Sequence, residues 1–159
     1  MLLPRAALLA ALLAAVALPA RAFDDKEHKL KDTLKVRDLQ GGFAGLTGKQ
    51  YTIQPSGKWA EYSIRGNNAT PTRNGALSKK DLAKLAAEVA KYDPGTLKST
   101  GKAKVNPHVI TVTYGKTTAK LTTAGGEMPK PDTDSLEGRF AGILAAVQNA
   151  LPKVKGKGK

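Results

Sequence analysis

The sequence predicts an α+β fold, a small two-layer domain in which an antiparallel sheet built from hairpins carries two amphipathic helices on one face. Two pairs of alternating apolar and polar runs are each joined by a tight-turn sequence, which is typical of β-hairpins. Two longer stretches repeat their apolar residues at the helical spacing. Strands linked by short turns and followed by helices favour this class. We expect one such domain over residues 34–152.

The first predicted strand, residues 34–39, leads into the glycine-rich run Gly41-Gly42-Phe43-Ala44-Gly45. Glycine permits positive φ and close backbone approach, so the run is interpreted as the bend between this strand and the rest of the sheet. Phe43 at its centre is either a plug into the core or an offered contact. We expect the core position, because a lone phenylalanine near strands usually packs inward. The pairing of the first strand with either hairpin stays open.

The first predicted hairpin joins residues 49–54 and 58–65 through Pro55-Ser56-Gly57. A two-residue Ser56-Gly57 loop would pair Ile53 with Ala60 and Tyr51 with Tyr62. That register predicts a buried face made of five side chains: Tyr51, Ile53, Ala60, Tyr62 and Ile64. Trp59 and Glu61 would then point to the opposite face. The polar stretch 66–75, which contains Pro71, is interpreted as a loop.

The second predicted hairpin joins residues 108–114 and 117–123 about Gly115-Lys116, where glycine in first position suits a type II′ turn. This register places Ile110 opposite Leu121 and Val112 opposite Ala119. The alternate positions are mostly threonines, which is typical of a sheet with one wet face.

Two helices follow from capping and periodicity. Ser78, with Asp81 three residues on, predicts the start of the first helix, and Asp93-Pro94-Gly95 predicts its end. Its apolar stripe is Leu82, Leu85, Ala86 and Val89. The second helix is expected from about Ser135, with Thr133 or Asp134 as cap, to Pro152. Its inward residues are Leu136, Phe140, Ile143, Val147 and Leu151.

Both ends of the chain differ from the domain in composition. Residues 1–22 combine Arg5, an Ala/Leu run and small residues before Phe23, which predicts a Sec-type signal peptide cleaved after Ala22. The expected location is therefore secreted or periplasmic, in a bacterium. Residues 23–33 are dense in mixed charge and are interpreted as a flexible leader or a frayed helical turn. Residues 153–159 are interpreted as a disordered, lysine-rich tail.

Composition limits the possible functions. The chain has no cysteine, which excludes disulfides, thiolate nucleophiles and cysteine-based metal sites. Its formal net charge is +13, and loss of Arg5 and Arg21 with the signal peptide would lower it to +11. A protein with this charge attracts acidic partners or surfaces.

Catalytic constellations are scarce in the sequence. His28 lies in the predicted leader, and His108, at a strand start, is expected to be a surface residue. The serines stand in turns, caps or strands without an accompanying nucleophile motif. Asp132, Asp134 and Glu137 precede or begin a helix, where the helix dipole explains them. We therefore predict no catalytic residue, no metal site and no cofactor.

Binding of an anionic polymer is a separate possibility. The alternating lysines of the tail, Lys153, Lys155, Lys157 and Lys159, are the candidate cations for such a polymer. Trp59 is the one aromatic that the predicted faces leave free for stacking on a base. Four other aromatics are assigned to the core face: Tyr51, Tyr62, Tyr114 and Phe140.

The Gly41-Gly42-Phe43-Ala44-Gly45 run, preceded by Val36-Arg37 in a short strand, resembles the opening of emfourin-like proteins, the small bacterial inhibitors of protealysin and related thermolysin-like metalloproteases. The later strand 109–114, its hairpin partner and the closing helix are similar in order. The resemblance covers about residues 34–151, and the glycine run is its specific part. It implies that Gly41, Gly42, Phe43, Ala44 and Gly45 form an inhibitor motif. The signal peptide and the Pro55-Ser56-Gly57 hairpin depart from the family's pattern.

We therefore expect a secreted, non-enzymatic binding protein. The resemblance implies that it inhibits an exported thermolysin-like protease. The alternative is a cationic module that binds anionic polymers such as cell-wall material, extracellular DNA or acidic polysaccharide. No membrane span is expected after removal of the signal peptide, and the oligomeric state is left open.

Overall fold

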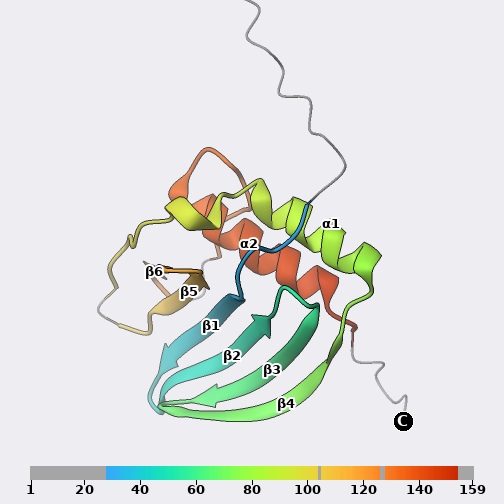
Figure 1. Ribbon diagram of the computed structural model, residues 1–159. Coiled ribbons are helices and arrows are strands. Elements are labelled where there is room, and N and C mark those ends of the chain that lie inside the picture. Colours follow the sequence, from blue (N-terminus) through green and yellow to red (C-terminus); the bar gives the residue numbers. More distant parts are fainter. Residues whose placement is uncertain (1–27, 104, 126–127, 154–159) are drawn as a thin grey trace, which may run out of the picture.

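The computed structural model describes residues 28–103, 105–125 and 128–153. Within them the chain forms a six-stranded antiparallel sheet with two α-helices on one side (Figure 1). The strands are β1 (Leu34–Gly42), β2 (Gly45–Ile53), β3 (Lys58–Arg65), β4 (Asn68–Ala76), β5 (His108–Tyr114) and β6 (Thr117–Thr123). The helices are α1 (Lys79–Ala90), α2 (Leu136–Ala150) and the short 3-10 helix η1 (Pro94–Thr96). The predicted α+β class and its two layers are confirmed.

Strand β1 is one of the two central strands, because the sheet order is β4-β3-β2-β1-β5-β6. It pairs with β2 through the glycine turn and with β5 from the second hairpin, so it joins the two hairpins into one sheet. This answers the pairing question that the sequence left open. The second hairpin has the predicted register, with Ile110 opposite Leu121 and Val112 opposite Ala119. Gly115 has a φ of 57°, as a primed turn requires at its first position.

The predicted register of the first hairpin is wrong by one residue. Ile53 lies opposite Trp59, and Tyr51 lies opposite Glu61. The turn is a three-residue loop closed by Gln54 and Lys58, in which the Gln54 amide donates to the Lys58 carbonyl over 2.8 Å. The positive φ of Gly57, 85°, fits the bulged end of such a loop.

The one-residue shift moves every side chain of β3 to the other face. Trp59 and Glu61 therefore face the helices and are buried, while Ala60, Tyr62 and Ile64 face away. Trp59 is 7% exposed, so the prediction that it is free for stacking is wrong. Tyr62 is half-buried on the face away from the helices rather than in the main core.

The prediction of a loop over residues 66–75 is wrong for most of that stretch, because residues 68–76 form the edge strand β4. This strand pairs with β3 along its whole length. The register shifts between Glu61 and Tyr62 of β3, because β4 has one extra residue there, Thr72. The Thr72 hydroxyl donates to the Glu61 carbonyl over 3.1 Å. Pro71 is tolerated because an edge strand needs partners on one side only.

Both helices occur where the sequence predicts them. The Ser78 hydroxyl accepts a hydrogen bond from the Asp81 amide over 3.1 Å and caps α1. The cap of α2 is Ser135, which accepts from the Gly138 amide over 2.9 Å, and not Thr133 or Asp134 as predicted. No helix in the described part of the chain is long and apolar enough to cross a membrane.

The main core lies between the helices and the sheet face that they cover, which we call the helix-side face. The large, fully buried side chains from α2 are Phe140, Ile143, Leu144 and Val147, and Leu151 beyond its end is also buried. Leu30, in the described part of the segment interpreted as a flexible leader, joins this core at 4% exposure. Residues 1–27, which contain the predicted signal peptide, and the tail lysines Lys155, Lys157 and Lys159 lie outside the described residues.

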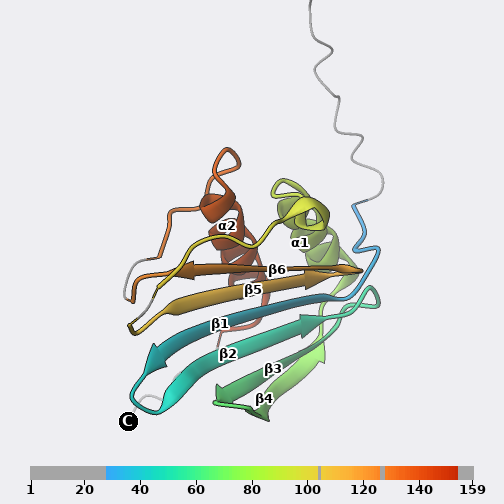
Figure 2. The same ribbon diagram turned by 90° about the vertical axis from the view of Figure 1, so that its left-hand side faces the viewer.

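The opposite face, here the open face, carries no helix in the described structure (Figures 1 and 2). It is defined by Lys35, Arg37 and Leu39 of β1 and by the residues aligned with them across the sheet. Near one end it holds a small apolar cluster of Leu39, Ile64 and Val109. Gly48 lies between Leu39 and Ile64 in the register, and its missing side chain lets these two meet.

Candidate functional site

Three loops meet at the end of the sheet where β1 ends. They are the β1–β2 turn, the loop that leads into β5, and the segment that follows β6, and Figure 2 shows them together on the left of the view. We call this region the loop end and define it as residues 40–45, 105–107, 124–125 and 128. The predicted inhibitor motif, residues 41–45, is its most prominent part.

Phe43 stands at the tip of the β1–β2 turn. Gly42 and Gly45 are the last aligned pair of the two strands, so Phe43 and Ala44 alone make the connection. Gly45 has a φ of 84°, which favours glycine at that position. The relative exposure of Phe43 is 113%, so the expectation that it packs in the core is wrong. Phe43 lies beyond the paired strands and is open to solvent.

Glycines let the three loops pack against one another. The Gly41 amide donates to the Pro107 carbonyl over 2.6 Å, and the Gln40 side-chain amide donates to the Asn106 carbonyl over 3.1 Å. A Cβ at Gly41 would clash with the Pro107 ring, and a Cβ at Gly125 would clash with the Asn106 carbonyl. The tip that carries Phe43 is therefore held at its base by hydrogen bonds and close packing between the loops.

The loop end exposes apolar side chains beside an open depression. Among the described residues, the large hydrophobic side chains that are exposed are Phe43, Val105 and Met128. Each belongs to a different loop of the loop end. The depression has a volume of about 540 Å³ and is lined by Gln40, Gly41, Gly42, Phe43, Asn106 and Gly125. Exposed apolar groups on a rigid support are typical of a surface that binds another protein.

His108 lies behind the loop end and is not the surface residue that the sequence predicts. It is 8% exposed, and its Nε2 lies 2.7 Å from Asp38 Oδ1. The pair links β5 to β1 on the helix-side face, where His108 lies directly opposite Gln40 in the register. We interpret it as a support for the strands from which the loops extend.

A buried ion-pair cluster holds the other half of the sheet. The Glu61 side chain is 5% exposed, accepts hydrogen bonds from Arg73 Nε and Nη2, and lies 3.0 Å from Lys49 Nζ. Burial acts to raise the pKa of Glu61, but the hydrogen bonds from Arg73 and Lys49 outweigh it and lower that pKa below its ordinary value. Arg73 also donates to the Pro152 carbonyl over 2.6 Å, which ties the end of α2 to β4.

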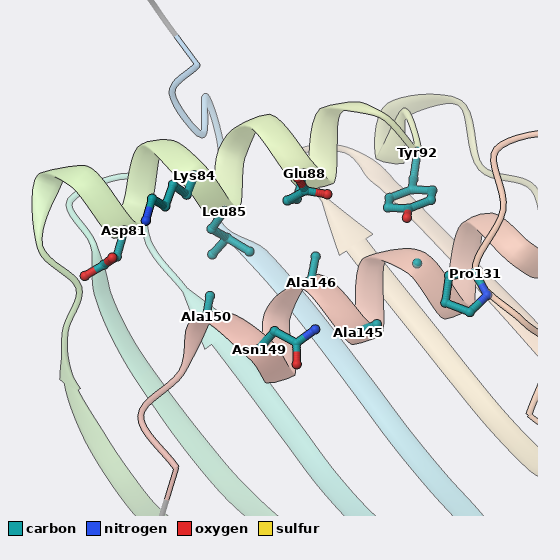
Figure 3. A pocket seen from close by; sticks show the side chains of 11 residues that line it. Asp81, Lys84, Leu85, Glu88, Tyr92, Pro131, Ala145, Ala146, Asn149 and Ala150 are labelled. Atoms are coloured by element: carbon teal, nitrogen blue, oxygen red, sulfur yellow. The ribbon is translucent and has the colours of Figure 1, made fainter.

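A groove of about 510 Å³ runs between α1 and α2 (Figure 3). Its floor is apolar, and Tyr92 packs on Gly142 where any side chain would clash. Two carboxylates on its rim are already engaged, Asp81 with Ser78 and Glu88 with Lys91. The groove therefore offers no set of convergent catalytic groups.

The acidic residues before α2 act on the helix start. Asp132 accepts hydrogen bonds from the Ser135 amide, the Ser135 hydroxyl and the Asp134 amide, and these lower its pKa. Among the described residues, no three His, Asp or Glu side chains gather to hold a metal ion. The chain matches no protein-family model and no curated protein sequence.

Two exposed apolar residues that sequence reasoning missed, Val105 and Met128, lie in the segments before β5 and after β6. Both stand singly in polar or irregular segments, so no periodicity draws attention to them. The available signal was a large apolar residue with no element to pack it. Lys153 is the one candidate lysine of the tail among the described residues, and it is exposed beyond the end of α2.

Proposed function

We propose that this protein is a non-enzymatic binding protein that binds a partner protein through its loop end. The observation that carries the proposal is the full exposure of Phe43 on a turn whose base is held by hydrogen bonds. An exposed phenylalanine costs solubility and contributes nothing to the core, so its place at a supported tip favours a contact role. Val105 and Met128 would flank the contact.

The proposed partner is an exported metalloprotease of the thermolysin-like class. The resemblance of residues 41–45 to the emfourin-like inhibitors supports this choice of partner. A rigid hairpin tip suits inhibition, because a preorganised contact loses little conformational entropy on binding. Occlusion of the protease's substrate cleft then requires no chemistry from the inhibitor. Export of this chain stays a prediction of its first 22 residues.

The test is inhibition of a thermolysin-type protease by the purified protein, followed with a peptide substrate. We expect inhibition at about 10 μM protein, above the dissociation constant of a micromolar complex. Phe43→Ala should weaken inhibition by roughly 30-fold or more, as loss of a hot-spot aromatic does. Lys116→Ala, on the β5–β6 turn at the opposite end of the sheet, is the matched control and should inhibit like the parent protein.

The two parts of the proposal fail separately. If the parent protein leaves thermolysin-type enzymes and other exported proteases fully active, the protease partner is wrong. If it inhibits and Phe43→Ala inhibits equally well, the partner stands and the loop end is the wrong surface. Unfolding of Phe43→Ala in denaturant should match the parent within about 0.5 kcal/mol, because the side chain is exposed.

A second candidate function is the binding of an anionic polymer. Its sequence-based support, the lysine tail, lies outside the described residues apart from Lys153. A separate observation favours it in the folded domain: Lys35, Arg37 and Lys120 are all exposed on the open face. The attraction would weaken with salt, since such contacts release counterions.

A further inference from the structure

The two faces of the sheet differ in their carboxylates. Among the described strand residues the carboxylates are Asp38 and Glu61, and both lie on the helix-side face with cationic or histidine partners. On the open face the charged residues of the strands are all cationic, namely Lys35, Arg37, Lys58 and Lys120. Among the strand residues, the open face therefore carries cations and no carboxylate.

The cations of this face are available to a ligand. Lys35 and Lys120 are exposed, and within the described part of the chain neither has an ion-pair partner. The Arg37 Nε donates to Gln50 Oε1 over 2.7 Å. Gln50 is 7% exposed, so a buried amide holds the guanidinium in place and leaves its two Nη groups for an anion. An arginine oriented in this way loses little entropy on binding.

The spacing of the cations suits an extended polymer. Lys120 is aligned with Thr111, and Thr111 is aligned with Arg37, so these three lie in one row across β6, β5 and β1. Two strand spacings separate Lys120 from Arg37 by about 10 Å, and two residues along β1 separate Arg37 from Lys35 by about 7 Å. A small anion could reach one of these groups, whereas a chain with repeated charges could reach all three.

The remaining open-face side chains favour a sugar over a nucleic acid. Thr52 and Thr111 supply hydroxyls that can both donate to and accept from sugar hydroxyls. The Thr113 hydroxyl accepts from the Thr118 hydroxyl over 3.2 Å and can itself donate to a sugar. Tyr62 is the one aromatic among the strand residues of this face, and it is half-buried. Bases would lack the successive stacking partners that single-strand binding surfaces provide.

From these observations we infer that the open face binds an acidic polysaccharide, with Lys35, Arg37 and Lys120 as the groups that contact its carboxylates or sulfates. This inference rests on the second candidate function and is independent of the loop end. The polymer would lie across β6, β5 and β1, on the side of the sheet away from both helices (Figure 2).

The experiment measures binding of the purified protein to heparin, as a sulfated probe, and to polygalacturonate, as a carboxylated probe. The variant Lys35→Gln/Arg37→Gln/Lys120→Gln should bind roughly 100-fold more weakly, as expected for three cations at an anionic surface. Its slope of log affinity against log salt should fall by about two to three. The matched control, Lys79→Gln/Lys80→Gln/Lys84→Gln on α1, removes the same charge and should lose less than about threefold.

Further variants separate the possible failures. A protein lacking residues 153–159 should keep most of its affinity. If that deletion abolishes binding and the open-face variant binds normally, polymer binding stands and our inference is wrong. If the parent protein binds neither probe, both the second candidate function and the inference fail. Equal losses in the two triple variants, or tighter binding to single-stranded DNA than to either polysaccharide, would also overturn it.

Arg37→Lys keeps the charge and gives up the hydrogen bond that orients the guanidinium. It should lose about three- to tenfold in affinity with the salt slope almost unchanged. An unchanged affinity would contradict the inference that Gln50 orients the Arg37 guanidinium for binding. Phe43→Ala should bind both probes like the parent, which keeps this test distinct from that of protease inhibition. Circular dichroism of each variant checks that the fold is intact.

Discussion

Replacing Arg73 by methionine tests the ion-pair cluster that holds β3 to β4. Glu61 is buried, and Arg73 supplies two of its hydrogen bonds. Methionine keeps much of the side-chain length, so the Trp59 ring, whose centroid lies 5.7 Å from the Arg73 guanidinium carbon, stays covered. The substitution removes the charge and also the hydrogen bond to the Pro152 carbonyl. Glu61 would then depend on Lys49 alone.

The expected loss of stability is about 3 kcal/mol at neutral pH. Removing one member of a buried ion pair typically costs about 3–5 kcal/mol, because the other charge is left buried without compensation. The lower end applies here, since the Lys49 side chain is 55% exposed and still reaches Glu61. For a domain of this size the melting temperature should fall by roughly 10 °C.

The pH dependence gives the sign of the effect. The folded-state pKa of Glu61 in the parent lies below its ordinary value of 4.5, so its contribution is present above about pH 4.5 and is lost as the pH falls through the lower, folded-state pKa. Arg73→Met removes the arginine hydrogen bonds that lower the pKa of Glu61. Burial, which raises that pKa, then has the larger effect, so the pKa of Glu61 should rise. Protonation then relieves the buried charge, and the deficit should shrink as the pH falls from 7 to 4.

Urea unfolding of parent and variant at pH 7 and pH 4 measures both effects. Arg65→Met, an exposed arginine at the end of β3, is the matched control and should change stability by less than about 0.5 kcal/mol. The double variant Glu61→Leu/Arg73→Met should recover most of the loss, since a buried ion pair can be replaced by apolar groups at little cost. A loss below about 1 kcal/mol at pH 7, or an equal loss at both pH values, would refute the reasoning.

Three further predictions use denaturant unfolding as the measurement. Leu30→Ala should cost about 2–4 kcal/mol, because Leu30 is buried in the core, whereas a flexible leader would show no change. Gly41→Ala should cost about 1–3 kcal/mol and weaken protease inhibition, because the new methyl displaces Pro107, and unchanged behaviour would contradict the proposed packing of the loops. Ser135→Ala should cost about 1 kcal/mol through loss of the α2 cap. Thr133→Ala should cost less than about 0.5 kcal/mol, and a larger loss in Thr133→Ala than in Ser135→Ala would support Thr133 as the cap.

Elements with local signals could be predicted from the sequence. The helices follow from apolar spacing and from serine caps, and the second hairpin follows from Gly115 and from alternation with threonine. These signals act within a few residues, so no knowledge of the rest of the fold is needed. The glycine run also predicts a turn, although it does not predict that Phe43 is exposed.

Elements that depend on distant partners could not be predicted. β4 is polar and contains Pro71, and it becomes a strand because β3 offers an unpaired edge. Phe43 is exposed because the strands on either side of it are paired up to Gly42 and Gly45, which leaves the tip beyond the sheet. Burial of His108 likewise requires Asp38, which lies 70 residues away in the chain.

The length of one turn decides which face of the sheet can attract an anion. Both phases of β3 contain apolar residues, with Trp59 on one and Tyr62 and Ile64 on the other, so alternation alone allows either register. A two-residue loop at Ser56-Gly57 would turn Glu61 onto the open face, two strands from Arg37, and its carboxylate would break the positive surface. The three-residue loop instead buries Glu61 against Arg73 and Lys49. The same shift that stabilises the sheet therefore keeps the open face free of carboxylates, which is the condition that binding of an acidic polysaccharide requires.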